Sequence, residues 1–106
     1  MELKLLTTKE KSNGSIINIY QIGNYKIVEE SNSNYNFISV RVDEDASEYI
    51  PEIYTRDEDF KVVSFAIQTT SYGPLLIDEI EEVIKGFNEA VEVVKILTDK
   101  FITAVK

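Results

Sequence analysis

Apolar and polar residues alternate along the first two thirds of the chain, in short runs separated by turn residues. Within 35–42, for example, Ile38, Val40 and Val42 fall on one face of an extended chain. Asn13-Gly14 and Gly23-Asn24 favour tight hairpin turns. The pattern predicts β-strands over 2–8, 15–22, 25–30, 35–42 and 60–70. A brief pairing over 49–54 is confined to a sheet edge, because Pro51 lacks an N–H donor.

The period changes after the TTSYGP stretch, and a single long helix is predicted over 77–104. Asp78 and Glu81 have the spacing of a capping box, which places the start of the helix near Asp78. Apolar residues recur at alternating spacings of three and four, which predicts one face packed on the sheet. That face comprises Ile77, Ile80, Ile84, Phe87, Val91, Val94, Thr98, Phe101 and Val105, widened on one flank by Val83, Ala90, Leu97 and Ala104.

These elements predict an α+β fold, in which an antiparallel β-meander of about five or six strands packs against one long C-terminal α-helix. No crossover helix separates the strands, so a parallel sheet is not expected. A chain of 106 residues is long enough for one core, and no linker divides it. We therefore expect a single domain over 1–106, with the sheet in 1–70 and the helix in 77–104.

The charge balance is the unusual feature of the composition, with 19 acidic residues against 11 basic residues and a formal net charge of −8. Such a surface repels nucleic acids and attracts basic partners, so no direct binding to nucleic acid is expected. The chain has no Cys, His or Trp, which removes thiolate and imidazole chemistry and the usual zinc sites. We find no targeting segment and no run long enough to cross a bilayer, and we expect no membrane association and a cytoplasmic protein.

Carboxylates are densest between Val42 and Asp59, where a calcium loop is one interpretation. Asp43, Asp45 and Ser47 occupy the first, third and fifth positions of an EF-hand loop. The pattern then fails, since Glu48 replaces the glycine of the sixth position and Tyr54 replaces the closing glutamate of the twelfth. We predict no metal site and no cofactor.

A second interpretation is an acidic edge that binds a basic protein. Its predicted residues are Asp43, Glu44, Asp45, Glu48, Asp57, Glu58 and Asp59, with Tyr49 and Tyr54 as apolar anchors. A row of carboxylates can also imitate the spacing of phosphates, so inhibition of a host nuclease or DNA-binding protein by nucleic-acid mimicry is an alternative. The simplest alternative is a solvated edge whose charges prevent the sheet from pairing with other chains.

The second half of the helix carries further apolar residues outside the main face, namely Val93, Ile96 and Ile102. A helix that packs on one sheet does not need them. Either this second side packs on another part of the same chain, or it meets a partner helix, and we expect a homodimer formed through the helix. Gly86, in the middle of the helix, marks either close packing against another helix or an ordinary surface position.

Enzyme chemistry has weaker support in the sequence. Asp43 with Asp45, or Asp57 with Asp59, has the residue types for acid–base catalysis, and six tyrosines are present. The chain lacks a phosphate-binding glycine loop and a nucleophile elbow. We predict no catalytic residues, and an enzyme or small-ligand binder that uses carboxylates and tyrosines is kept as an alternative.

The stretch from Phe65 to Phe101 resembles the C-terminal part of small uncharacterised acidic proteins of Gram-positive bacteria and their mobile elements. The resemblance rests on TTSYG, which leads from a strand into an acidic helix start, and on GFNEAVEVV. It covers about a third of the chain and implies an accessory role without naming a ligand. Together with the charge, it favours a small non-enzymatic interaction module.

Overall fold

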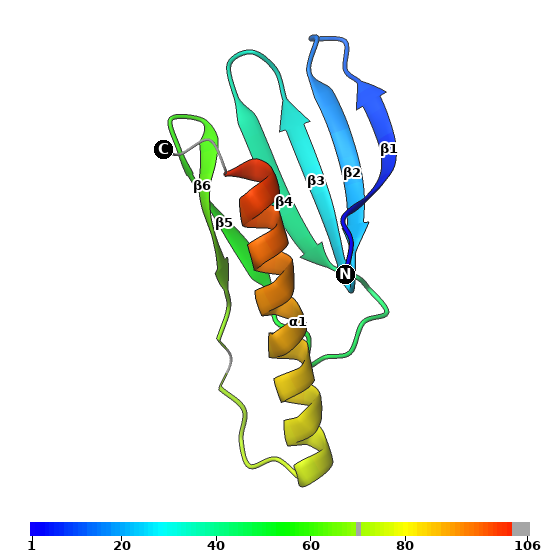
Figure 1. Ribbon diagram of the computed structural model, residues 1–106, viewed down its shortest axis with the longest axis vertical. Coiled ribbons are helices and arrows are strands. Elements are labelled where there is room, and N and C mark those ends of the chain that lie inside the picture. The colour runs from blue at the N-terminus through cyan, green and yellow to red at the C-terminus, as the bar shows by residue number, and fades with distance from the viewer. Residues whose placement is uncertain (70, 103–106) are drawn as a thin grey trace.

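A computed structural model describes residues 1–69 and 71–102, which form one six-stranded sheet and one long helix (Figure 1). The predicted α+β fold is confirmed. The end of the predicted last strand at Thr70, and Ala104 and Val105 of the predicted helix, lie outside the described residues. The elements are β1 (Lys4–Glu10), β2 (Ile16–Ile22), β3 (Tyr25–Ser31), β4 (Asn36–Val42), β5 (Ile53–Glu58), β6 (Lys61–Ile67) and α1 (Ile77–Phe101).

The strand order is β1-β2-β3-β4-β6-β5, so the predicted meander holds only for the first four strands. After β4 the chain crosses the end of the sheet and returns as a β5–β6 hairpin, whose turn residues Asp59 and Phe60 both have positive φ. β6 meets β4 in parallel through a single pair, Asn36 with Lys61. The predicted edge position after Pro51 is confirmed, but the edge strand is Ile53–Glu58 rather than 49–54.

The core lies between one face of the sheet and one face of α1. Alternate residues of β2 and β3 point toward the helix, and Ile22, Tyr25 and Ile27 are almost completely buried there. Val93 and Leu97 of α1 meet them and are fully buried. Each such side chain contributes about 1.5–3 kcal/mol by leaving water. The helix therefore holds the sheet mainly through its second half.

The face of α1 that packs on the sheet differs from the prediction. The buried positions are Gly86, Ala90, Val93 and Leu97, of which the sequence analysis placed only Ala90 and Leu97 toward the sheet. The predicted face is largely exposed, because the first half of α1 projects beyond the end of the sheet and has no layer to meet (Figure 1). The exposed members of that face are Ile77, Ile80, Ile84, Val91 and Thr98.

The helix begins at Ile77, as predicted, but its cap differs from the prediction. Leu76 is the N-cap residue, and the Glu79 carboxylate accepts the backbone N–H of Leu76 at 2.9 Å. The predicted capping box at Asp78 and Glu81 is wrong, because Glu79 already provides this reciprocal contact two residues upstream. Asp78 and Glu79 still lie in the first turn, where negative charge complements the helix dipole.

Candidate functional site

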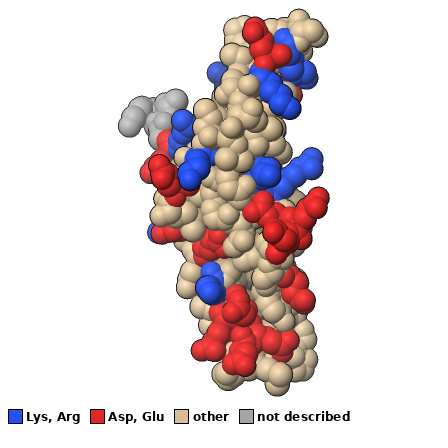
Figure 2. Space-filling view, turned by 90° about the vertical axis from the view of Figure 1, so that its right-hand side faces the viewer, with Lys and Arg blue, Asp and Glu red and all other residues tan. Residues whose placement is uncertain are grey.

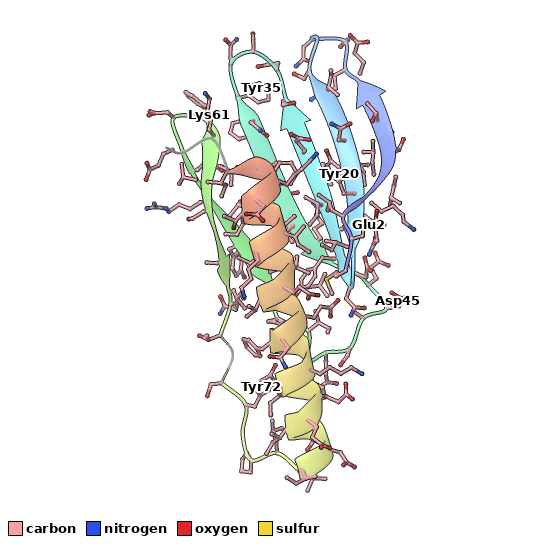
Figure 3. The ribbon with its side chains drawn as sticks, viewed as in Figure 1. Glu2, Tyr20, Tyr35, Asp45, Lys61 and Tyr72 are labelled. Atoms are coloured by element: carbon pink, nitrogen blue, oxygen red, sulfur yellow. The ribbon has the colours of Figure 1, made fainter. Side chains whose placement is uncertain are left out.

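The predicted acidic edge is not one surface. Asp43 directly follows β4, whereas the backbone of Asn36, the first residue of β4, donates to the carbonyl of Phe60 beside the 57–59 carboxylates. The two acidic groups are thus separated by the length of β4, about 23 Å. In Figure 3, Asp45 and Lys61 mark these opposite ends of the sheet. The prediction of a single edge is wrong because the chain between the two groups runs back along β5.

The 43–52 loop is fixed against the sheet at both of its ends. At one end the backbone N–H of Asp43 donates to the carbonyl of Asn24 at 2.9 Å, and its carboxylate accepts Gln21 Nε2 at 2.7 Å. At the other end the hydroxyl of the buried Tyr25 donates to the carbonyl of Pro51. Burial raises the pKa of Tyr25 far above its ordinary value. Tyr25 is therefore a neutral donor that holds the loop in place.

Gly86 explains how this loop can lie against the helix. A Cβ atom at this position would sit 2.6 Å from the carbonyl oxygen of Tyr49 and 3.5 Å from Cδ of Pro51. Only a residue without a side chain permits so close an approach of the loop backbone. Neither interpretation from the sequence is right, because Gly86 is buried and the segment that approaches it is the 43–52 loop rather than another helix.

Tyr49 joins the loop to the first turns of α1. Its hydroxyl donates to Glu79 Oε2 at 2.9 Å, and its ring contacts that of Tyr72 edge-to-face at 5.8 Å between centroids. The backbone N–H of Leu76, and then the Tyr49 hydroxyl, hold the pKa of Glu79 below its ordinary value. Tyr49 was predicted as an apolar anchor for a partner, and the structure places it as a bridge within the protein. Tyr54 lies on β5, where its hydroxyl donates to Glu52.

The contacts of Tyr49 link two acidic segments, the 43–52 loop at the end of the sheet and the first turns of α1. Figure 2 shows acidic side chains gathered over its lower half, where α1 begins. The sequence analysis used Asp78 only as a helix cap and did not connect the helix carboxylates with the loop, because the contact that joins the two segments spans thirty residues. We name this surface the acidic end. It comprises Asp43, Glu44, Asp45, Glu48, Asp78, Glu79 and Glu82.

The acidic end differs from the 57–59 group in how its charge is balanced. Over residues 1–69 and 71–102, the two ion pairs are Lys11 with Glu30 and Arg56 with Glu58, each at 3.2 Å. The second belongs to the 57–59 group. Neither involves the acidic end, so its negative charge is not offset by a paired cation.

Two hollows flank the sheet. One, of about 580 Å³, lies between the β5–β6 turn and the end of α1 and is lined by Asn36, Glu58, Asp59, Lys61 and apolar residues. The other, of about 630 Å³, includes Lys26, Arg41 and the 43–45 carboxylates. Neither lining contains a tyrosine. Among the described residues, no three carboxylates are grouped in a way that could hold a metal ion.

The residues predicted to form a dimer interface pack inward instead. Val93 is completely buried in the single chain, and Ile96 and Ile102 are partly buried against the core. The prediction is wrong for Val93 because its side of the helix is the one that meets the sheet. Ile96 and Ile102 lie on the margins of the same contact.

Comparison of the chain with protein-family models, curated proteins and solved structures found no match. The resemblance to proteins of Gram-positive bacteria therefore stays a prediction. In the described part of the chain, no helix has the length and apolar character required to cross a membrane.

Proposed function

We propose that the protein is a non-enzymatic interaction module, acting in the cytoplasm, whose acidic end binds a basic protein partner. The observation that carries the proposal is that the Tyr49–Glu79 hydrogen bond and the Gly86 contact hold the carboxylate-rich loop against the carboxylate-rich first half of α1. Holding like charges together costs free energy, and a solvated loop would relieve that cost by moving away. Here the loop is instead fixed at three points.

The charge of this surface indicates the chemistry of the partner. Clustered carboxylates without paired cations attract a segment rich in lysine and arginine, and they accelerate its encounter at low ionic strength. The separation of the two acidic groups weighs against the alternative of a nucleic-acid mimic that uses all of 43–59. The accessory role implied by the resemblance is compatible with a basic protein partner in general and with a nuclease or DNA-binding protein in particular.

The test compares two neutralised variants as bait for proteins of the natural host. In the first, Glu44→Gln, Asp45→Asn, Glu48→Gln and Glu82→Gln remove charge from the acidic end. In the matched control, Asp57→Asn, Glu58→Gln and Asp59→Asn remove charge from the other group. We expect a basic protein that is retained by the wild type and the control, lost from the first variant, and released by salt.

Two results would count against the proposal. Equal retention by both variants would place binding elsewhere, and retention that survives high salt would point to an apolar contact. Displacement of the captured protein by DNA would move the interpretation toward inhibition of a nucleic-acid-binding protein.

A further inference from the structure

The projecting half of α1 carries an apolar line that the single chain leaves uncovered. Ile77, Ile80, Ile84, Phe87 and Val91 recur at alternating spacings of three and four, and four of the five are exposed. The exposed fractions are 71% for Ile77, 39% for Ile80, 54% for Ile84 and 43% for Val91. We name these five residues the helix seam.

The helix seam has the spacing by which two helices pack together. Alternating steps of three and four define the a and d positions of a heptad, and such residues interlock with the same positions of a second helix. At about 100° per residue, the seam lies roughly 130° around the helix from the buried Ala90–Val93 line. Asp78 and Glu82 lie on the other side of this buried line from the helix seam, so the seam and the acidic end are separate surfaces.

The residues beside the helix seam favour a second copy of the chain as the partner, in antiparallel orientation. Glu81, Asn88 and Lys95 fill successive e positions, and in an antiparallel pair e positions face one another. Glu81 and Lys95 lie one heptad on either side of Asn88. An antiparallel copy centred near Asn88 would therefore place Glu81 opposite Lys95 twice and Asn88 opposite itself.

A parallel arrangement of the two helices is unfavourable. A parallel copy would bring together two helix starts that each carry Asp78, Glu79, Glu81 and Glu82. Like charges at this distance repel, whereas the antiparallel arrangement places each acidic start beside the lysines of the other helix. The antiparallel pattern of e-position charges is self-complementary, as a twofold interface requires.

From these observations we infer that the chain forms an antiparallel homodimer with its twofold axis near Asn88, in which Ile84, Phe87 and Val91 of the two helix seams pack together. Ile77 and Ile80 then extend over the second half of the other helix. The surface is distinct from the one predicted by sequence, which used Val93, Ile96 and Ile102. The dimer would carry two acidic ends that point in opposite directions, and its formation does not depend on the function proposed above.

The first test is the mass in solution by sedimentation equilibrium, at about 100 µM chain, where a dimer of micromolar affinity is almost complete. We expect the wild type to be a dimer and Ile84→Asp, with unchanged circular dichroism, to show a substantial monomer fraction, its dissociation constant raised at least about 30-fold. The control is Ile16→Asp on β2, which places the same change at another exposed isoleucine, 44% against 54% for Ile84, and should remain dimeric. A monomeric wild type would overturn the inference.

Charge exchange tests the direction and register. Glu81→Lys or Lys95→Glu alone should each weaken the dimer roughly tenfold, and the double variant should recover the affinity of the wild type. The chain lacks cysteine, so single engineered cysteines report geometry directly. With a short bis-maleimide, Asn88→Cys should crosslink, and Glu81→Cys should not, because its two copies would be about 21 Å apart along the helices. Crosslinking of Glu81→Cys, or a double variant as weak as the single variants, would overturn the antiparallel arrangement.

Discussion

Because Gly86 contacts the 43–52 loop, we predict that replacing it with alanine destabilises the protein, the opposite of what helix propensity alone predicts. In an exposed helix, glycine to alanine stabilises by up to about 1 kcal/mol. In Gly86→Ala, however, the new Cβ would lie 2.6 Å from the carbonyl oxygen of Tyr49, whereas ordinary contact begins at 3.4 Å. The obstructing atom belongs to the backbone, so the 49–51 segment must move as a unit.

The cost of that movement exceeds the gain. Overpacking costs about 1–3 kcal/mol, and displacing Pro51 weakens its hydrogen bond from Tyr25, which is worth about 1 kcal/mol. We expect Gly86→Ala to lower the free energy of unfolding by about 1–2 kcal/mol, or the melting temperature by about 4–8 °C. Denaturant titration monitored by circular dichroism measures this, with the exposed neighbour Lys85→Ala as a control that should change little.

A double-mutant cycle identifies the cause. If Gly86→Ala displaces the loop, Tyr25→Phe should cost less in that background than in the wild type, because the hydrogen bond to Pro51 is already weakened. A variant as stable as the wild type or more stable would refute the role assigned to Gly86. Additive effects would refute the proposed route through Pro51.

Three further changes test the core and the titrating groups. Leu97→Ala, at a fully buried position, should lower the free energy of unfolding by about 2–5 kcal/mol in urea titration, and Thr98→Ala should change it far less. Burial, followed by the charge of Glu29, raises the pKa of Tyr20 to about 12, so the stability it contributes below pH 10 should fall as pH rises from 10 toward 12. Tyr20→Phe should flatten that fall in melting temperature, and absorbance should show late ionisation of Tyr20. The pKa of Glu79 is lowered by its bond from Leu76 and then from Tyr49, so its contribution is present at neutral pH and should be lost as pH falls through the lowered value. Glu79→Gln should make melting between pH 6 and pH 3 less dependent on pH.

Local patterns predicted the elements well because they act over a few residues. Alternation of apolar residues located β2, β3 and β4 within one or two residues, and glycines at 14 and 23 take the positive φ that their turns require. The side of α1 that meets the sheet was predicted poorly. The exposed residues Ile77 and Ile84 are as apolar as the buried Val93, and only the end of the sheet decides which of them is covered.

The candidate site was missed for a related reason. The loop and the helix are joined by the hydrogen bond from Tyr49 to Glu79 and by the close packing of the loop backbone on Gly86. Both contacts join residues that are thirty or more positions apart. A glycine in mid-helix was the one signal in the sequence, and it did not indicate which segment approaches. The clustering of acidic residues in 42–59 suggested one surface, yet β5 separates the 43–48 carboxylates from the 57–59 carboxylates in space.

The single residue pair between β4 and β6 has a consequence for how the chain acquires its structure. The first four strands hydrogen-bond in the order in which they are synthesised, but their apolar face stays open until α1 exists. A two-stranded hairpin is marginal alone, and one pair to β4 adds little to β5 and β6. Both parts of the sheet therefore await the last element, so that partly synthesised chains expose Tyr25 and Ile27 and depend on the cell to keep them from aggregating until Leu97 emerges.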